Sequence, residues 1–210
     1  MKSRVASTLQ QYIPSPETRQ KMKESVRRAR DLFMATGALV ITSPVYPLIA
    51  LAIKLESRGP VFYLQERVGQ NQERFMIRKF RSMHLPENRT DDPDAVGHNE
   101  EAITKVGWFL RKFTLDELPQ LLHVLSGHMQ VVGPRPLATQ YIDFDDPVFQ
   151  RSLEIKPGLI SEGSIAKRHS AYEVTDKEGA AIDNEYEARR TFISDMMVLI
   201  KSVAAIHKGR

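Results

Sequence analysis

The 210-residue sequence contains no cysteine, which excludes disulfides and thiolate metal sites. A reducing, cytoplasmic environment is therefore the default expectation. No short apolar stretch with a small-residue cleavage site opens the chain, so no signal peptide is expected. The sequence has no GxGxxG, P-loop or serine-centred elbow motif, and its six histidines are not spaced as metal ligands. The usual signatures of dinucleotide binding and serine hydrolysis are thus missing.

The composition suits a globular fold with a basic surface. Hydrophobic residues make up 41% of the sequence and charged residues 27%, which fits one domain or one domain with an appendage. The formal net charge of +4 favours anionic partners such as nucleic acid, anionic lipid or nucleotides. Because the basic residues flank one apolar segment rather than alternating with aromatic residues, nucleic acid is not an expected partner.

A long apolar segment lies in the N-terminal third of the chain. Residues 32–53 are almost free of charge, and about 22 residues of helix extend roughly 33 Å, enough to cross a bilayer core of about 30 Å. Ser43, Pro44 and Pro47 interrupt this segment. Each proline removes a backbone donor and clashes with the preceding turn. The segment therefore predicts two short helices joined by a break at Ser43 and Pro44.

Basic residues flank the apolar segment on both sides. They are Lys21, Lys23, Arg27, Arg28 and Arg30 before it, and Lys54, Arg58 and Arg67 after it. Because positive flanks prefer the cytoplasmic side, a re-entrant helix–break–helix that returns both flanks to the cytoplasm is expected. An ordinary proline-kinked transmembrane helix is the alternative. A buried core helix fits the length and the basic flanks less well.

The remainder of the sequence predicts a mostly helical α+β domain. The expected elements are a β-hairpin from residues 61–69 and 74–83, a loop over 84–99, helices over 103–113, 118–126 and 184–207, and a loop-rich stretch over 133–179. The last helix has one apolar face, which suits core packing or, alternatively, contact with a membrane surface.

Two adjacent acids, Asp116 and Glu117, lie in the segment LRKFTLDELPQLLHVLSG. With Thr114 as the N-cap of a helix, Glu117 would complete a capping box, but Pro119 would then fall where a helical donor is required. With Asp116 as the cap, Pro119 falls where no donor is needed. The positive end of a helix and the nearby Arg111 both favour ionised carboxylates.

The carboxylate pair is compatible with three roles. It can cap a helix and nothing more, bind a divalent cation through oxygen, or supply a carboxylate nucleophile. Arg135 lies between two prolines in the segment GPRP, which presets its guanidinium for phosphate recognition or simply forms a surface turn. Lys79 and Arg81 are two residues apart in the second predicted strand, so both could face one site or a solvated surface.

Taken together, these segments resemble the bacterial sugar transferase family, the monotopic phosphoglycosyl transferases. The similarity covers about residues 30–205. It is carried by the broken apolar segment, ERVGQNQERFMIRKFRSM, VGWFLRKFTLDELPQLLHVLSGHMQVVGPRP, the KPG at 156–158, and Asp183, Tyr186, Thr191, Phe192 and Asp195. The DELPQL and GPRP blocks together are far more specific than either alone.

The resemblance implies a fold and a reaction. The implied fold is a re-entrant membrane helix joined to a small cytosolic α+β domain with a β-hairpin and interfacial amphipathic helices. The implied reaction transfers a sugar-1-phosphate from a nucleotide-diphospho-sugar, of the UDP-sugar class, to polyprenyl (undecaprenyl) phosphate through a covalent aspartyl phosphosugar, which initiates glycoconjugate biosynthesis. The expected location is the bacterial inner membrane, with the lipid bilayer as a partner and the catalytic domain facing the cytoplasm.

The resemblance also implies roles for individual residues. Asp116 matches the nucleophile, and Glu117 matches the dyad glutamate that is associated with Mg²⁺, so both are expected metal ligands. Arg111, Arg135 and Lys79 are the expected ligands of the substrate phosphates. Such a set is chemically sufficient because phosphoryl transfer depends on positioning and charge neutralisation.

The expected domain plan is a loose N-terminal arm at 1–18, the basic flank with the re-entrant helix at 19–57, and a cytosolic catalytic domain at 58–210. One segment departs from the family pattern. Family members commonly follow KPG with an ITGxAQVNGRN-like sequence, whereas this chain reads LISEGSIAKRHS. The resemblance therefore assigns no sugar or nucleotide contact within 159–170. A membrane-surface scaffold with the same fold but no catalysis is the alternative function, and a homodimer is left open.

Overall fold

The computed structural model describes residues 15–85, 102–170, 172 and 174–207. Its described elements are α2 (Pro16–Thr42), α3 (Val45–Glu56), β1 (Phe62–Val68), η1 (Gln70–Gln72), β2 (Arg74–Phe80), α4 (Lys105–Lys112), η3 (Leu115–Gln120), α5 (Leu121–Ser126), β3 (Gln130–Val132), η4 (Thr139–Tyr141), α6 (Pro147–Leu153), β4 (Gly158–Ile160), α7 (Glu162–His169), α8 (Asp176–Ala188) and α9 (Phe192–His207). The predicted mostly helical fold with a small hairpin is confirmed. Most of the predicted N-terminal arm and of the loop over 84–99 lies outside the described residues.

Helix α2 begins earlier than the sequence predicts. The side chain of Ser15 accepts a hydrogen bond from the backbone N–H of Thr18 at 3.2 Å, and Pro16 occupies the first helical position. A serine N-cap followed by proline is a strong helix start, because both satisfy the unpaired donors of the first turn. Residues 16–18, which the sequence predicts as part of the loose arm, are therefore helical.

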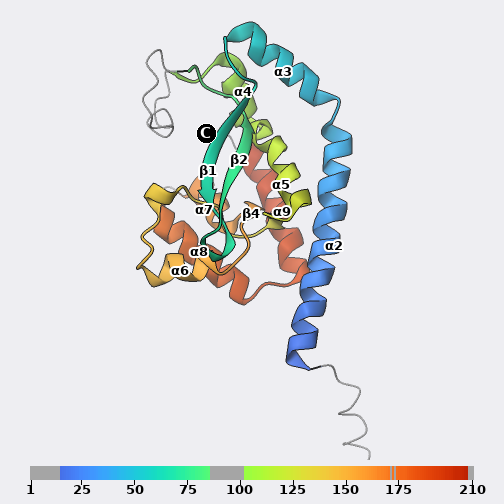
Figure 1. The fold of residues 1–210 in the computed structure, drawn as a ribbon, viewed down its shortest axis with the longest axis vertical. Helices are drawn as coiled ribbons and strands as arrows, with labels where there is room; N and C mark the ends of the chain where they lie inside the picture. Colours follow the sequence, from blue (N-terminus) through green and yellow to red (C-terminus); the bar gives the residue numbers. More distant parts are fainter. Residues whose placement is uncertain (1–14, 86–101, 171, 173, 208–210) are drawn as a thin grey trace, which may run out of the picture.

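The apolar segment is bent where the sequence predicts a break. Helix α2 ends at Thr42 and α3 begins at Val45, with an angle of 59° between them. Pro44 lies at the bend. Because proline has no backbone N–H to donate within the helix, the helix breaks there. Within the described residues, no helix alone combines the length and apolar composition of a membrane span, whereas α2 and α3 do so as a bent pair. In Figure 1, α2 runs along one side of the molecule, and α3 continues from its upper end across the top of the molecule toward α4.

Strands β1 and β2 form the predicted antiparallel hairpin, with Tyr63 opposite Lys79. Phe75 and Ile77 are buried on one face of β2. Because side chains alternate along a strand, Lys79 projects from this same inward face at the end of the strand. The burial of Phe75 and Ile77 thus fixes the register that directs the Lys79 amine into the domain.

The stretch over 133–179 contains α6, β4 and α7 as well as the start of α8, so its prediction as loop is wrong. Asp146 caps α6 by accepting the backbone N–H of Val148 at 2.8 Å, and Ser161 caps α7 by accepting that of Ser164 at 2.9 Å. These helices have seven and eight residues, which is too short for an apolar period to stand out.

The single helix predicted over 184–207 is two helices, α8 and α9. The Thr191 hydroxyl accepts the backbone N–H of Ser194 at 3.1 Å and so starts a new helix. Arg190 lies between the two helices and is buried against Asp195. This tertiary ion pair stabilises the break, and apolar spacing alone cannot reveal it.

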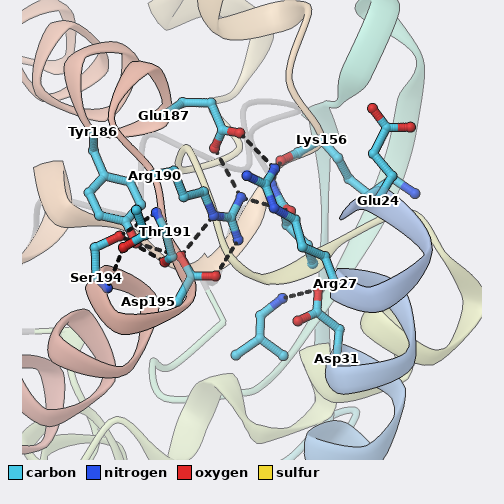
Figure 2. Close-up of polar contacts among 12 residues, drawn as sticks. Glu24, Arg27, Asp31, Lys156, Tyr186, Glu187, Arg190, Thr191, Ser194 and Asp195 are labelled. Atoms are coloured by element: carbon cyan, nitrogen blue, oxygen red, sulfur yellow. Dashed lines mark hydrogen bonds and ion pairs between the residues drawn. The ribbon is translucent and has the colours of Figure 1, made fainter. Parts of the chain in front are cut away.

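Asp195 links α2, α8 and α9 through a buried polar network. Figure 2 shows its contacts with Tyr186 and Arg190, beside the pairing of Arg27 on α2 with Glu187 on α8. Asp195 is 1% exposed and accepts hydrogen bonds from Arg190 Nε at 2.7 Å, from the Tyr186 hydroxyl and from Arg30 on α2. Burial by itself raises the pKa of Asp195, but the hydrogen bonds from Arg190 and Tyr186 and the charge of Arg190 outweigh it and lower the pKa. The network therefore fastens the long helix α2 to the rest of the domain.

We expect Asp195→Ala to lower the free energy of unfolding by about 3–5 kcal/mol, because it leaves buried guanidinium groups without their main partner. The measurement is chemical denaturation of the detergent-solubilised protein at pH 7. A lowered folded-state pKa means that this stabilisation is present above the unfolded-state pKa and is lost as the pH falls through the folded value.

The matched control is Asp176→Ala, which removes the ion pair between Asp176 and Lys167. Both side chains of this pair are about one-third exposed. It is expected to cost less than about 1 kcal/mol. Equal losses for the two variants would contradict an anchoring role for Asp195.

Candidate active site

The acidic pair lies on η3, a short 3₁₀ helix, rather than at the start of an α-helix. Thr114 has a left-handed backbone with φ 56° and ψ 24° and makes no side-chain cap bond, while Asp116 lies inside η3. Both capping arrangements considered from the sequence are therefore wrong. The left-handed threonine reverses the chain directly after α4. Such strained positions are uncommon outside glycine and cluster at functional sites.

Glu117 is held by cations. Lys79 Nζ donates to its Oε1 at 2.8 Å, and the Arg135 guanidinium lies 3.7 Å from the same oxygen. The Glu117 side chain is 15% exposed. Burial by itself raises its pKa, but the charges of Lys79, Arg135 and Arg168 and the hydrogen bond from Lys79 lower it to about 2. Glu117 is therefore ionised at neutral pH, as the sequence predicts.

Asp116 behaves differently. Burial raises its pKa, and the adjacent negative charge of Glu117 raises it further, while Lys79 and Arg111 oppose the rise. The expectation that a helix start lowers the pKa of both acids is therefore wrong for Asp116. The two neighbouring carboxyl groups are shifted in opposite directions, which is the usual sign that they have different chemical tasks.

The predicted phosphate ligands reach the pair from separate elements. Lys79 comes from the end of β2, and Arg111 comes from the last turn of α4, where its Nε donates to Ser82 Oγ at 2.9 Å. Arg135 follows β3 in the GPRP turn. The structure thus brings Lys79, Arg111 and Arg135 around the two acids.

Arg81 does not join this site. Its guanidinium donates to the carbonyl oxygens of Ser57 at 2.8 Å and Arg58 at 3.0 Å, and the side chain is buried there. Arg81 therefore secures the end of α3. Of the two strand cations considered from the sequence, Lys79 alone pairs with the acids.

The GPRP turn is fixed by a close approach of two backbones. Gly133 N donates to Ile160 O at 3.0 Å, and Gly158 N donates to Pro134 O at 2.8 Å. A Cβ on Gly158 would lie 2.1 Å from Gly133 N, so a side chain does not fit there. The two strands therefore meet only because both positions are glycine, and Arg135 projects from a rigid turn.

Arg168 is a site residue that the sequence does not reveal. It lies on α7, in the segment that departs from the family pattern, and its Nη1 donates to Thr114 Oγ1 at 3.2 Å. Its charge also lowers the pKa of Glu117. Ser161 as a helix cap, with Lys167 and Arg168 in the last turn, is the signal that could have placed this cation at a helix end.

Among the described residues, no three histidine, aspartate or glutamate side chains gather in a way that could hold a metal ion. Mg²⁺ in phosphate-transferring sites is commonly held by one or two carboxylates, with the substrate phosphates and water completing the shell. Asp116 and Glu117 supply that number of carboxylates. The donor set therefore fits Mg²⁺ only together with a phosphate-bearing substrate.

Lys79, Arg111, Arg135 and Arg168 surround the adjacent carboxylate pair, and such a cluster of cations suits the binding of phosphate groups. Comparison with known proteins identifies the family. The sequence model described as bacterial sugar transferase matches residues 22–209. The chain therefore belongs to the bacterial sugar transferase family, and the predictions of this family and of a transferase enzyme are confirmed.

Similarity to individual proteins supports the same family. The chain is 33% identical over 198 residues to the exopolysaccharide production protein ExoY of Rhizobium meliloti (strain 1021), covering 88% of this chain and 86% of that protein. It is 44% identical over 144 residues to the UDP-glucose:undecaprenyl-phosphate glucose-1-phosphate transferase of Escherichia coli (strain K12), covering 67% of this chain and 31% of that enzyme. The enzyme of the same name from Caulobacter vibrioides is 33% identical over 187 residues, with 86% and 69% covered.

Replacing Lys79 tests the electrostatics of the site. In the intact protein, Glu117 has a pKa of about 2, below its unfolded value near 4.5, so its stabilisation is present above pH 4.5 and is lost as the pH falls through about 2. Lys79→Gln removes the closest cation and its hydrogen bond, so only Arg135 and Arg168 still oppose the effect of burial, and the Glu117 pKa should rise. The variant should lose about 1–3 kcal/mol of unfolding free energy at pH 7 and less at pH 4.

Denaturant unfolding at the two pH values measures this difference. Arg74→Gln is the matched control, because it removes an exposed ion pair with Glu66 from the same hairpin. It should cost little at either pH. A deficit for Lys79→Gln that is the same at pH 7 and pH 4 would show that the lysine contributes packing rather than charge.

Proposed function

We propose that this protein transfers a sugar-1-phosphate from a nucleotide-diphospho-sugar, with UDP-sugars as the donor class, to undecaprenyl phosphate. The observation that carries the proposal is the Asp116–Glu117 pair, in which one acid is paired with Lys79 and the other has a raised pKa. The relatives support it, since the enzymes from Escherichia coli and Caulobacter vibrioides are both named for glucose-1-phosphate transfer from UDP-glucose to undecaprenyl phosphate.

In the first half-reaction, an Asp116 carboxylate oxygen attacks the phosphorus atom next to the sugar. The bond between that phosphorus and the oxygen bridging the two phosphates breaks, and a nucleoside monophosphate leaves. In the second half-reaction, a phosphate oxygen of the acceptor attacks the same phosphorus, which releases the Asp116 carboxylate and forms the polyprenyl diphosphosugar. No external base is needed, because both nucleophiles are anions.

The surrounding cations offset the charge that accumulates at the donor. Arg135 and Arg168 lie beside Glu117, and Arg111 lies beside Asp116, so a diphosphate would be surrounded by guanidinium groups. Bound Mg²⁺, held through Asp116 and Glu117 with the substrate, would polarise the phosphoryl oxygens. The positive charge of Lys79 keeps Glu117 anionic. Burial and the negative charge of Glu117 raise the pKa of Asp116, the reacting carboxylate.

A membrane location agrees with the exposed surface beside the site. Helix α3 exposes Leu48, Leu51 and Leu55. The adjoining α4 exposes Trp108 and Phe109, and Phe113, directly after α4, is exposed as well. Lys112 lies over the Trp108 ring at 4.8 Å. An aromatic and basic edge next to an apolar face suits the boundary between lipid tails and headgroups. We propose that α2 and α3 form a re-entrant hairpin that enters the bilayer at the bend, with the catalytic domain on the cytoplasmic face.

We expect the protein to form a covalent phosphosugar at Asp116. With UDP-glucose and Mg²⁺ but no polyprenyl phosphate, the enzyme should release about one equivalent of UMP and gain the mass of a glucose phosphate. Intact-protein mass spectrometry and a UMP assay measure the two products. Asp116→Asn should release no UMP and gain no mass, while circular dichroism shows an intact fold, because asparagine has the same shape.

Glu117→Gln serves as the matched variant, since it keeps the nucleophile but removes the neighbouring charge. It should weaken the dependence on Mg²⁺ while an adduct still forms. UMP release that requires the lipid acceptor, with no trapped adduct, would favour direct transfer in a ternary complex. No turnover with any nucleotide-sugar would instead favour a scaffold.

We expect both ends of the α2–α3 pair to face the cytoplasm. The sequence lacks cysteine, so Lys23→Cys and Arg58→Cys each introduce a single thiol. In intact cells, neither thiol should react with a membrane-impermeant reagent, and both should react after permeabilisation. Lys177→Cys, on α8, marks the cytoplasmic domain as a control. Labelling of one flank alone from outside would establish a true span.

A further inference from the structure

Asp183 is a buried carboxylate for which the proposed reaction has no use. It lies on α8, is 4% exposed and faces two different segments of the site. Its Oδ1 accepts the backbone N–H of Gly163 at 2.8 Å, and its Oδ2 accepts the backbone N–H of Arg135 at 3.3 Å. A buried carboxylate is expensive to retain unless it is hydrogen-bonded. The two bonds therefore suggest that Asp183 holds these two backbone segments in place.

Both segments that Asp183 holds carry a cation of the site. The Arg135 N–H belongs to the GPRP turn, whose guanidinium lies 3.7 Å from Glu117. Gly163 lies in the first turn of α7, the helix whose last turn carries Arg168. Arg168 in turn donates to Thr114, two residues before Asp116. One carboxylate thus connects the backbones that support the two guanidinium groups.

Close packing around Asp183 keeps α7 and α8 in fixed positions relative to each other. A Cβ on Gly163 would lie 2.3 Å from Gly179 O on α8, so α7 and α8 touch backbone to backbone. Ser161 caps α7 and its side chain also bonds Asp183. Burial, with a smaller effect of Glu162, raises the pKa of Asp183 to about 6, while the bonds from Gly163, Arg135 and Ser161 oppose that rise.

We propose that Asp183 is a positioning residue that sets the Arg135 and Arg168 guanidinium groups for the donor diphosphate, through the backbone of the GPRP turn and the first turn of α7. The inference rests on the proposed function, because it names what these cations bind. Asp183 does not touch the substrate in this arrangement. It acts through two other residues, and that dependence can be measured.

Asp183→Asn is the informative variant. An amide has one acceptor oxygen and one donor group, so it can satisfy either Gly163 N–H or Arg135 N–H but presents a donor to the other. The test measures UDP-glucose binding by calorimetry in the Asp116→Asn protein with Mg²⁺, where no turnover occurs. Asp183→Asn should raise the dissociation constant about tenfold.

The decisive step is a double-mutant cycle. If Asp183 acts by placing Arg135 and Arg168, its replacement should cost less once either guanidinium is gone. In the Arg135→Ala and Arg168→Ala backgrounds, the penalty for Asp183→Asn should fall to about threefold or less. An unchanged tenfold penalty in both backgrounds, or no penalty in the parent protein, would overturn the proposal.

Two controls separate positioning from folding. Asp146→Asn removes another helix-capping carboxylate, on α6, and should change UDP-glucose binding less than about twofold. If Asp183→Asn does not fold, Ser161→Ala loosens α7 more gently; its penalty should disappear in the Arg168→Ala background, and a persisting penalty overturns the inference. Wild-type protein that neither binds nor turns over any nucleotide-sugar would contradict the proposed function instead, so the two failures are distinguishable.

Discussion

The ion pair between Lys79 and Glu117 is the interaction on which the site depends. Two adjacent carboxylates in a half-buried turn repel each other, and burial penalises both charges. Lys79 arrives from the inward face of β2 and pairs with Glu117, whose pKa falls to about 2. Burial, together with the remaining negative charge of Glu117, raises the pKa of Asp116. The pair is thereby divided into a permanent anion and a more basic carboxylate, although the two residues are adjacent in sequence.

This division depends on a rigid scaffold, because the cations come from distant parts of the chain. The Arg135 turn is held by the contact between Gly133 and Gly158, where no side chain fits. Asp195 fastens α2 to the C-terminal helices through Arg190 and Arg30. Charges that are fixed before the substrate binds cost little reorganisation when phosphoryl charge develops, which is the main way a protein assists this chemistry.

The sequence predicts the parts of this structure that depend on local chemistry. The hairpin follows from its strand composition and turn, and the helix break follows from the missing donor of Pro44. The left-handed Thr114, the break at Arg190 and the approach of Arg168 to Thr114 were missed, because tertiary contacts determine each of them. Lys79 and Glu117 are 38 positions apart, and their pairing was not predicted, because the family resemblance assigned Lys79 to the substrate phosphates.

In the proposed re-entrant orientation, the bend in the apolar segment sets where the site lies relative to the membrane. A polyprenyl phosphate keeps its chain in hydrocarbon and its phosphate in the headgroup layer, because burying a phosphate charge in lipid is prohibitively costly. If α2 and α3 formed one straight span, only the residues that flank the span would lie at the headgroup layer. The 59° bend instead turns α3 back over α4, whose last residues lead directly into Thr114 and the acids. In the proposed orientation, the break at Pro44 that prevents a straight helix would place the carboxylate pair at the depth where the acceptor phosphate lies.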